Sequence, residues 1–457
     1  MKFYNTLTNR LEEFAPLHNR LATLYSCGPT VYDVAHIGNL RTYLFNDVLK
    51  RTLLANDFRV KHVMNVTDVD DKTIKKSGGD KTRLRELTRR YEKIFFEDLS
   101  ALNILLPDLV TRATAYVERM ADFVAELLRR GFAYRGEDGS VYFSIDKFKD
   151  YGKLAKLDRA GIRAGARVSQ DEYTKENPAD FVLWKAWDKD DGDIYWETKI
   201  GRGRPGWHIE CSVMAGETLG QTIDIHTGAV DLIFPHHENE IAQSEALSSK
   251  DFVRFWVHGE HLLVDSQKMA KSLGNVYNLK DLTERGFSPL DFRYLVLGAH
   301  YRTKLNFTWA GLEAAKNARE RLNRLMPEIT SEVNVPKHLR GGGAEVNQDY
   351  LNKFYDRISD DLDTPGGLAT LWEMARDESV SAEIRTATAQ KMDEVLGLKL
   401  GEKEELAIPP EIKKLAAKRE EARRQKDYAL SDKIRQELEG KGWRIEDKKT
   451  GYLLTKI

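Results

Sequence analysis

Cysteine is almost absent from this chain of 457 residues, in which only Cys27 and Cys211 occur. Two cysteines cannot build a disulfide scaffold, and so few are typical of a reducing compartment, which predicts a cytoplasmic location. No run approaches the roughly 18 consecutive apolar residues of a membrane-spanning helix, and the first residues lack the apolar stretch of a secretory signal. We therefore expect no membrane partner.

Excess charge of either sign is also missing, because 71 lysines and arginines stand against 72 aspartates and glutamates. A nucleic-acid partner would have to be held by a local basic patch, since the charge of the whole chain provides no attraction. What the chain does have is a globular composition, with 41% hydrophobic and 31% charged residues. At about 150 residues per domain, its length indicates about three domains.

The first part of the chain has the pattern of a strand, a helix and a second strand. Residues 21–28 have the texture of a buried strand, residues 36–56 carry apolar side chains at helical spacing, and residues 58–66 alternate. This order predicts a right-handed parallel crossover. Strand-like runs resume further along, at 206–211, 222–226 and 255–258. We therefore predict an α/β fold built on a doubly wound, parallel, Rossmann-type sheet.

Changes of texture divide the chain into further parts. The predicted parts are a sheet domain (1–130 and 203–260), an inserted domain (131–202), a mixed region (261–326), a helical bundle (327–400) and a small α+β module (401–457). Proline and glycine mark two breaks, one at Val335-Pro336 and Gly341–Gly343 and one at Pro409-Pro410. We expect the last module to hold one long charged helix followed by a short strand-like tail.

Two short motifs have the chemistry of phosphate binding. His36-Ile-Gly-Asn39 lies between a strand and a helix, and the start of a helix attracts phosphate through its free N–H groups. Gly38 would allow an adenine ring to approach the backbone, and His36 could bind a phosphate oxygen. Lys268 and Lys271, three residues apart in a loop with serine and glycine, could clamp a triphosphate. Taken alone, the motifs are better explained as a helix cap and an exposed basic loop.

Four residues with metal-binding side chains fall beside these motifs. Cys27 ends the first strand, and we expect Cys211 to end another. His236 and Glu240 are four residues apart at the start of a helix, so they share one face. The carboxyl ends of the strands in a doubly wound sheet converge on one crevice. The set predicts a zinc site with sulfur, nitrogen and oxygen ligands, although each cysteine could instead be a small buried apolar residue.

In this order, the two phosphate motifs resemble the HIGH and KMSKS signatures of class I aminoacyl-tRNA synthetases. Nearly the whole chain resembles one family of that class, the cysteinyl-tRNA synthetases. The runs that carry the resemblance are Cys27-Gly-Pro-Thr-Val-Tyr-Asp33, Asn65-Val-Thr-Asp-Val-Asp-Asp-Lys72, Gly203-Arg-Pro-Gly-Trp-His-Ile-Glu-Cys-Ser212, Phe234-Pro-His-His-Glu-Asn-Glu240, the lysine loop, Asp360-Asp-Leu-Asp-Thr-Pro365 and Lys426-Asp-Tyr-Ala-Leu-Ser-Asp-Lys-Ile-Arg435.

The resemblance implies an ATP-dependent ligase that activates L-cysteine as an adenylate and transfers it to tRNA(Cys), with Mg²⁺ accompanying ATP. It implies one zinc per chain on Cys27, Cys211, His236 and Glu240, which recognises the cysteine thiolate. The implied catalytic residues are His36, Asn39, Lys268 and Lys271. Cysteine would be bound by Gly28, Thr67, Trp207 and His208, and ATP by His36, Gly38, Asn39, His226, Gly228, Asp231 and Lys271.

The resemblance also implies roles for the remaining parts of the chain. The inserted domain would be the family's connective peptide, and residues 261–326 would contact the tRNA stem. The bundle would bind tRNA, and the last module would bind the anticodon. We expect a monomer.

Three positions depart from the family pattern. Asn39 stands where many members have histidine, so it can donate to phosphate but cannot carry a proton. Ala270 replaces a serine in the lysine loop, which removes one hydroxyl. Thr227-Gly228-Ala229 stands where the family usually has a glycine-rich run. We expect that turn to approach adenosine less closely.

A basic stripe lies near the C-terminus, where residues 413–435 hold nine lysines or arginines and four acids. Such a stripe can follow phosphates, and Trp443 could stack on an unpaired base. The alternative is a solvated helix whose tryptophan anchors a small core. The family places its anticodon-binding module here, which favours nucleic-acid binding.

Two other functions are compatible with the same motifs. A ligase that joins activated cysteine to a small amine would keep the zinc and nucleotide residues, but it has no need of the C-terminal module. A catalytically silent relative could bind tRNA or zinc without forming an adenylate. The retained lysines and the His-Ile-Gly run favour the enzyme. A zinc-bound thiolate would also separate cysteine from serine, a difference of one atom that shape alone discriminates poorly.

Overall fold

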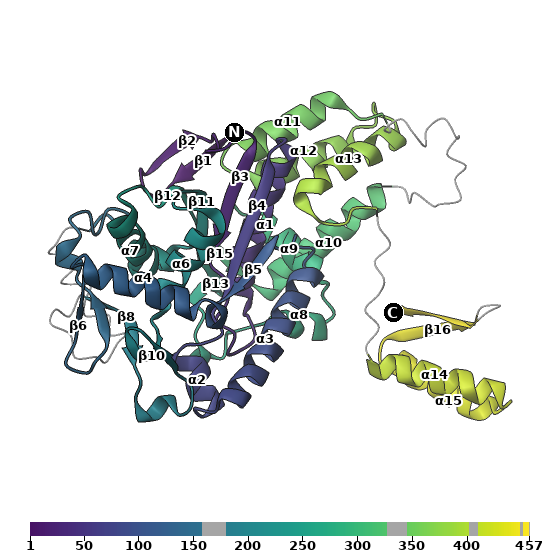
Figure 1. Ribbon diagram of the computed structural model, residues 1–457. Helices are drawn as coiled ribbons and strands as arrows, with labels where there is room; N and C mark the ends of the chain where they lie inside the picture. The colour runs from purple at the N-terminus through teal and green to yellow at the C-terminus, as the bar shows by residue number, and fades with distance from the viewer. Residues whose placement is uncertain (158–179, 327–344, 402–409, 448–450, 457) are drawn as a thin grey trace. The chain divides into compact units, whose positions relative to one another are not determined.

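The computed structural model describes residues 1–157, 180–326, 345–401, 410–447 and 451–456 (Figure 1). The chain divides into two compact units, Met1–Gly401 and Glu402–Ile457. The predicted break at Val335-Pro336 and Gly341–Gly343 lies outside the described residues, as does Pro409.

The centre of the larger unit is a five-stranded sheet in the order β12-β11-β3-β4-β5, in which all neighbours are parallel. Its strands are β3 (Leu21–Ser26), β4 (Arg59–Val66), β5 (Leu109–Arg112), β11 (Ile223–Ala229) and β12 (Val253–Gly259). The chain proceeds outward from β3 in both directions, so the predicted doubly wound α/β fold is confirmed. The crevice for a ligand in such a sheet lies at the carboxyl ends of the strands, between β3 and β11.

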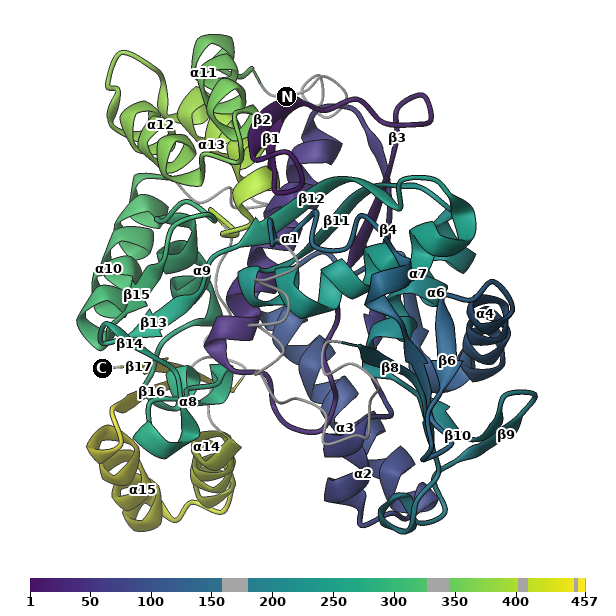
Figure 2. The same ribbon diagram turned by 90° about the vertical axis from the view of Figure 1, so that its left-hand side faces the viewer.

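Alternate side chains of the central strands pack against different helices. Leu24 and its neighbour Ile225 lie in the apolar core on the side of α1 (Ile37–Ala55). Tyr25 and its neighbour His226 face α6 (Trp207–Leu219) and α7 (Glu238–Ser248), which lie together on the opposite side of the sheet from α1 (Figure 2). Burying one large apolar side chain stabilises a fold by about 1.5–3 kcal/mol. The two cores therefore hold the strand ends, and the side chains that follow them, in fixed positions.

Smaller sheets and helices surround this centre. β1 (Lys2–Asn5) and β2 (Arg10–Glu13) form a hairpin, and α2 (Asp71–Ser77), α3 (Lys81–Ala101) and α4 (Val117–Arg129) follow the first crossover. A second five-stranded sheet, antiparallel throughout, consists of β6 (Ala133–Arg135), β7 (Val141–Phe143), β8 (Phe181–Ala186), β9 (Trp196–Thr198) and β10 (Gly201–Pro205). This sheet falls largely within the stretch where the sequence changes texture.

The rest of the larger unit is mostly helical. It contains β13 (Leu262–Val264), β14 (Gln267–Lys268), α8 (Leu279–Glu284), α9 (Pro289–Leu297), β15 (Leu305–Phe307) and α10 (Trp309–Leu325). The last three helices of this unit are α11 (Gln348–Ser359), α12 (Thr364–Arg376) and α13 (Ala382–Leu396). The apolar core on the α1 side of the sheet continues into these helices, so they share one core with the sheet.

A buried ionic cluster joins α1, α9 and α13. The Asp47 carboxylate on α1 lies 2.9 Å from Arg51 Nε and 2.5 Å from Arg293 Nη2. The same guanidinium groups donate to backbone carbonyls at the end of α13, Arg51 to Glu394 at 2.9 Å and Arg293 to Leu396 at 2.6 Å. Carbonyls in the last turn of a helix have no partner within the helix. The two arginines therefore complete α13 and fasten it to α1.

Two sequence-based expectations in this unit are wrong. The run at 206–211 is the start of helix α6 rather than a strand, so Cys211 lies on a helix. β10 ends at Pro205, and Gly206 in an extended conformation caps the helix that follows. The helix expected to open at Pro235 begins at Glu238, after a wide turn over Ile233–His237. Both misassignments involve runs too short for periodicity to decide.

The described residues of the smaller unit form two helices and a hairpin, α14 (Pro410–Arg424), α15 (Tyr428–Gly440), β16 (Trp443–Asp447) and β17 (Tyr452–Lys456). The prediction of a single long helix in this module is therefore wrong, because the chain turns at Lys426, which has a φ of 63°. Trp443 lies in a small core with Ile412 and Leu438, so its ring is not free to stack on a base. The predicted α+β composition of this module agrees with these elements.

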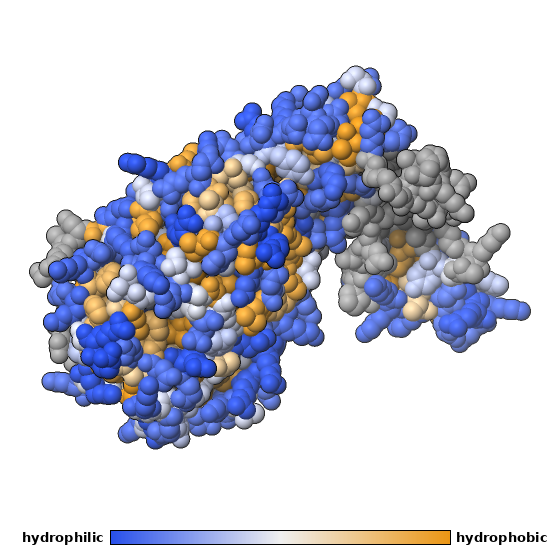
Figure 3. Space-filling model, turned by 45° about the horizontal axis from the view of Figure 1, so that its top comes forward, coloured by the Kyte–Doolittle hydropathy of each residue, from blue (hydrophilic) through white to orange (hydrophobic). Residues whose placement is uncertain are grey.

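In the view of Figure 3, patches of hydrophobic residues lie between hydrophilic ones on the larger unit. None of the helices in the described part of the chain combines the length and the apolar character needed to cross a membrane.

Asp98 on α3 provides a test of the packing of this helix. Burial raises the pKa of Asp98 to about 6, the charge of Glu97 adds to the effect, and Oδ2 has no hydrogen-bond partner. A carboxyl with a raised pKa in the folded state costs stability above that pKa, and the cost disappears as pH falls toward its unfolded pKa of about 4. We expect Asp98→Asn to stabilise the protein by about 1 kcal/mol at pH 8, after allowance for partial exposure.

Urea denaturation at pH 8 and pH 4.5 measures this difference. The gain should shrink at the lower pH, and Glu86→Gln, which changes an exposed carboxylate elsewhere on α3, should change little at either. An equal gain at both pH values would show that the carboxylate charge is not its cause.

Candidate active site

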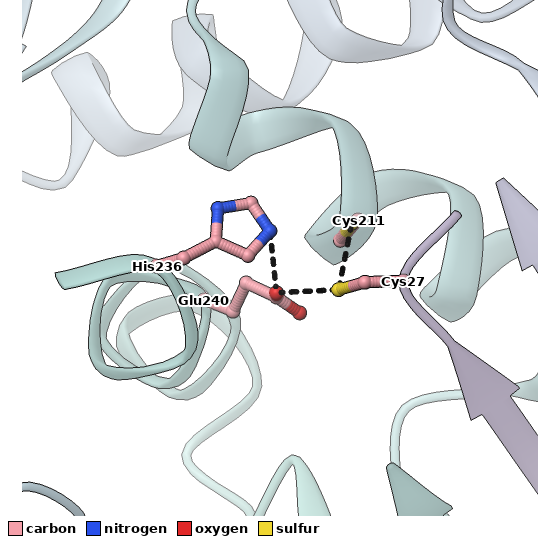
Figure 4. Close-up of side chains that lie close together, drawn as sticks. All are labelled: Cys27, Cys211, His236 and Glu240. Atoms are coloured by element: carbon pink, nitrogen blue, oxygen red, sulfur yellow. Dashed lines mark hydrogen bonds and ion pairs between the residues drawn. The ribbon is translucent and has the colours of Figure 1, made fainter. Parts of the chain in front are cut away.

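Four potential metal ligands meet at the carboxyl edge of the central sheet (Figure 4). Cys27 follows β3, Cys211 lies on α6, His236 lies in the wide turn, and Glu240 is on α7. Cys27 Sγ lies 3.8 Å from Cys211 Sγ and 3.9 Å from Glu240 Oε1, and His236 Nε2 lies 3.1 Å from the same oxygen. All four ligand atoms lie within 4.8 Å of one another.

The chemistry of these donors fits zinc. Two sulfurs, one imidazole nitrogen and one carboxylate oxygen are ligand types that zinc accepts in tetrahedral sites. Cys211, His236 and Glu240 are fully buried, and burial raises the pKa of both thiols in the absence of a metal. A metal must displace these thiol protons, so its affinity for the site would rise with pH.

A second set of four ligands overlaps the first. It combines Cys27 and Glu240 with His226 and His237. Cys27 Sγ lies 3.3 Å from His237 Nε2, and Glu240 Oε2 lies 2.9 Å from His226 Nε2. Burial alone would raise the pKa of Glu240, but His226 and His236 outweigh it and lower the value to about 2. Because the sets share two residues, they describe alternative positions for one ion.

Five buried histidines crowd this space, namely His208, His226, His236, His237 and His258. His208 Nδ1 lies 2.9 Å from His236 Nδ1, and His237 Nδ1 lies 2.8 Å from His258 Nε2. Burial lowers the pKa of His258 to about 3, so this ring is neutral at ordinary pH. Contacts of this kind fix the orientation of a ligating imidazole. The sequence reasoning missed His258, whose place near the end of a strand-like run was the available signal.

The predicted cysteine-binding residues lie around the cluster. The Trp207 ring stacks on His236 with centroids 4.2 Å apart. Gly28 N–H donates to the Asn65 side chain at 2.8 Å, and a Cβ at Gly28 would lie 1.6 Å from the Asn65 carbonyl oxygen, so only glycine fits. Thr67 Oγ1 donates to Glu210 Oε2 at 2.6 Å.

Glu210 is a buried carboxyl that the sequence reasoning also missed. Its Oε1 atom has no hydrogen-bond partner, and burial raises its pKa well above the usual range. An acidic residue inside an apolar run, directly before a potential ligand, was the signal for it.

The predicted phosphate-binding motif caps helix α1. His36 Nδ1 accepts from the Asn39 N–H at 3.2 Å, and Asn39 Oδ1 accepts from the His36 N–H at 3.3 Å. This reciprocal cap leaves His36 Nε2 and the Asn39 amide N–H groups for a ligand. A Cβ at Gly38 would lie 2.3 Å from Met269 Cε, so the lysine loop lies over the start of α1.

The two lysines of the loop are both exposed. Lys268 ends β14, and Lys271 opens a short turn over Lys271–Leu273. Lys271 Nζ lies 2.8 Å from Asp33 Oδ2, and this hydrogen bond raises the pKa of Lys271. The pKa of His36 is lowered by burial, while the charges of Asp231 and Lys271 act on it in opposite directions. Three predicted ATP-binding residues therefore lie close enough to interact.

Two other predicted ATP-binding residues lie beside the potential metal ligands. His226 is fully buried next to Glu240. Gly228 lies against the His237 ring, where an added Cβ would approach Cε1 to 2.6 Å. The second half of β11 therefore lies against the histidine cluster in this structure.

The sheet, the capped helix and the lysine loop together define a class I tRNA synthetase. Residues 13–317 match the family described as tRNA synthetases class I (C) catalytic domain. The chain is 46% identical over 465 residues to a cysteine–tRNA ligase of Chlamydia pneumoniae, which covers 98% of this chain and 97% of the relative. It is 44% identical over 470 residues to one of Protochlamydia amoebophila, which covers 100% of this chain and 98% of the relative. The chain belongs to the cysteine–tRNA ligase family.

Solved structures support the fold. A methionyl-tRNA synthetase of Mycobacterium tuberculosis matches with a TM-score of 0.56 at 14% identity, over 83% of this chain and 90% of that one. LeuRS of Agrobacterium radiobacter K84, in a ternary complex with tRNA and LeuAMS, matches with a TM-score of 0.60 at 11% identity, over 85% of each chain.

Proposed function

We propose that this chain joins L-cysteine to the 3′ end of tRNA(Cys) at the expense of ATP. The carboxylate of cysteine attacks the α-phosphorus of ATP, which gives cysteinyl-adenylate and pyrophosphate, and the terminal ribose hydroxyl of tRNA then attacks the adenylate. The convergence of Cys27, Cys211, His236 and Glu240 beside a capped helix carries the proposal, because it would place a thiol-selective metal next to a phosphate-binding helix end. We expect a cytoplasmic monomer.

The phosphate chemistry is assigned to four residues. His36 Nε2 and the Asn39 amide, at the N-terminus of α1, would donate to the α-phosphate as negative charge builds there. Lys268 and Lys271 would neutralise the departing pyrophosphate, and ATP would bring its own Mg²⁺. Positioning and charge stabilisation are sufficient for this step, so no covalent enzyme intermediate is required.

The cysteine-selective part of the site would be held by the four clustered ligands. A zinc ion bound there supplies a soft Lewis acid that prefers a thiolate to the hydroxyl of serine. Trp207 and His208 would keep His236 in its ligating orientation, through the stacking and the close ring contact described above. Gly28 and Thr67 would border the bound amino acid.

The remaining parts are assigned to tRNA. We propose that residues 261–326 contact the acceptor stem, that the bundle at 327–400 binds the body of the tRNA, and that the module at 401–457 binds the anticodon. Part of the basic stripe is engaged within the module, because Arg419, Arg423 and Arg435 all pair with Asp447. The exposed Lys413, Lys414 and Lys418 would then contact the phosphates.

Cysteine-dependent ATP–pyrophosphate exchange tests the proposed activity. We expect exchange with cysteine, little with serine, and about one zinc per chain in the same sample. Transfer to tRNA should then be measured with small amines as competitors. Absence of exchange in a sample with full zinc content would contradict the activity and favour a silent tRNA-binding protein.

Zinc analysis of single histidine variants separates the two overlapping ligand sets. If zinc is held by the set with both cysteines, His236→Ala should lose most of the metal, whereas His237→Ala should retain close to one per chain. Ser244→Ala, one turn after Glu240 on α7, is a matched control that should keep its zinc. The opposite result for the two histidines would assign the ion to the set with His226 and His237.

A further inference from the structure

A surface beside the lysine loop combines tyrosine rings with cationic side chains. We define the tyrosine–lysine surface by Tyr32, Lys72, Lys76, Arg90 and Tyr91, from the segment after β3 and from α2 and α3. Lys76 Nζ donates to the Tyr32 carbonyl at 2.7 Å and lies 3.2 Å from the Tyr91 hydroxyl. It also lies 4.7 Å from the Tyr91 ring centroid, and Lys72 lies 5.4 Å from that of Tyr32. The two rings are thus held next to ammonium groups.

The positive charge of this surface is poorly matched by nearby acids. Among the described residues, Lys72 and Arg90 form no ion pair with a carboxylate. Three acids on the same two helices pair with other residues, Asp71 with Arg204, Glu92 with Arg112 and Glu97 with Lys93. A surface with unneutralised cations and half-buried tyrosines has the chemistry that proteins use for unpaired nucleotides, whose bases stack on rings while their phosphates meet cations.

Asp33 connects this surface to the lysine loop. Its two carboxylate oxygens lie 2.8 Å from Lys271 Nζ and 3.6 Å from Lys76 Nζ. All three side chains are more than a third exposed, so each ion pair is weak and can be exchanged for a phosphate. Asp33 follows Cys27 by six positions, so their Cα atoms lie at most about 22 Å apart. Through Asp33, the surface adjoins the lysine loop, which is proposed to meet the phosphates of ATP.

We propose that the tyrosine–lysine surface binds the unpaired 3′ end of the tRNA as it approaches the adenylate. The proposal rests on the proposed function, because only a tRNA ligase must bring such a strand to this edge. The tyrosine rings favour a nucleotide strand as the ligand over the polyphosphate of ATP, because a polyphosphate has no base that could stack on them. Lys76 and Tyr91 are the central residues, since each contacts the other and Lys76 also contacts Asp33.

The test compares the two half-reactions in variants of this surface. In Tyr91→Ala and Lys76→Ala, we expect cysteine-dependent exchange within twofold of the wild type. Single-turnover transfer from preformed enzyme-bound cysteinyl-adenylate to tRNA(Cys) should fall about tenfold, the scale of one lost base stack. Tyr91→Phe keeps the ring and should transfer nearly normally. Lys75→Ala removes a neighbouring exposed charge from the same helix and is the matched control.

A tRNA that lacks its unpaired 3′ nucleotides provides the second measurement. Wild-type enzyme should bind full-length tRNA more tightly than the shortened one, and this difference should largely vanish in Tyr91→Ala. Unchanged transfer in Tyr91→Ala would overturn the proposal. Exchange that falls in parallel with transfer would also overturn it, because such a result would assign the surface to ATP binding or to folding. A wild-type enzyme that activates cysteine but charges no tRNA would overturn the proposed function itself.

Discussion

Cys27→Ser should remove most of the bound zinc and raise the KM for cysteine at least a hundredfold, while the Kd for ATP stays within about threefold. The serine hydroxyl is a poor zinc ligand at neutral pH because its proton is not displaced as a thiol proton is. Loss of even an outer contact of a metal site costs 10–100-fold in affinity, so loss of a ligand should cost more. ATP binding survives because the α1 cap and the lysine loop do not depend on Cys27.

Zinc content by atomic absorption and exchange kinetics at varied cysteine measure these effects. Cys211→Ser is the matched variant and should behave in the same way, since both sulfurs lie in the cluster. Stoichiometric zinc in Cys27→Ser would remove this residue from the ligand set. Full zinc loss with an unchanged KM for cysteine would show instead that the metal is structural.

Lys271→Ala should slow the formation of cysteinyl-adenylate by about 10²–10³-fold, with a smaller change in the affinity for cysteine. An ammonium group aimed at charge that develops in the transition state contributes on this scale. Lys271 is 76% exposed and held by Asp33 through one weak pair, so it is available to exchange that carboxylate for the phosphates of ATP. The effect should therefore appear in the chemical step.

Rapid-quench measurement of a single turnover of activation checks this expectation. Lys280→Ala is a suitable control, because Lys280 is 78% exposed and pairs with Glu284 in a similar surface setting. An activation rate in Lys271→Ala equal to that of the control would exclude the lysine from the step.

The central sheet and the ligand cluster could be predicted because their signals are local. β3 and β4 flank a helix of 19 residues with helical apolar spacing, a length at which periodicity is decisive. Cys27 and the pair His236 and Glu240 stand next to such elements. Because the carboxyl ends of parallel strands converge on one crevice, these residues could be expected to lie together. Cys211 lies with the other three residues, but it reaches the crevice from a helix and not from the end of a strand.

The tyrosine–lysine surface could not be predicted from the sequence. Lys76 is one of many lysines on charged helices, and only the packing of α2 and α3 brings it to Tyr32 and Tyr91. In the smaller unit, Arg419 looked like part of a solvated stripe, yet it is buried against Asp447. Such pairings join residues far apart in the chain, and no spacing rule reports them.

Asn39, which departs from the family pattern, has a structural role in the cap of α1. Its side chain accepts the His36 N–H in the cap of α1, so it contributes to the start of the helix as well as to any ligand. A reciprocal cap of this kind stabilises a helix by about 1 kcal/mol. Asn39 is therefore suited to stabilise the phosphate-binding turn, although it cannot carry a proton as a histidine would.

The ionic cluster of Asp47, Arg51 and Arg293 joins α1, α9 and α13, three helices far apart in the sequence, into one cooperative unit. Drawing α13 away from α1 would leave two buried guanidinium groups without their carbonyl partners, and each lost hydrogen bond of a charged group costs about 1.5–3 kcal/mol. Regions bound in this way open together in local unfolding rather than one after another. The same free-energy cost therefore opposes the local unfolding of α13, at the end of the bundle, and of α1, whose first turn is expected to meet ATP.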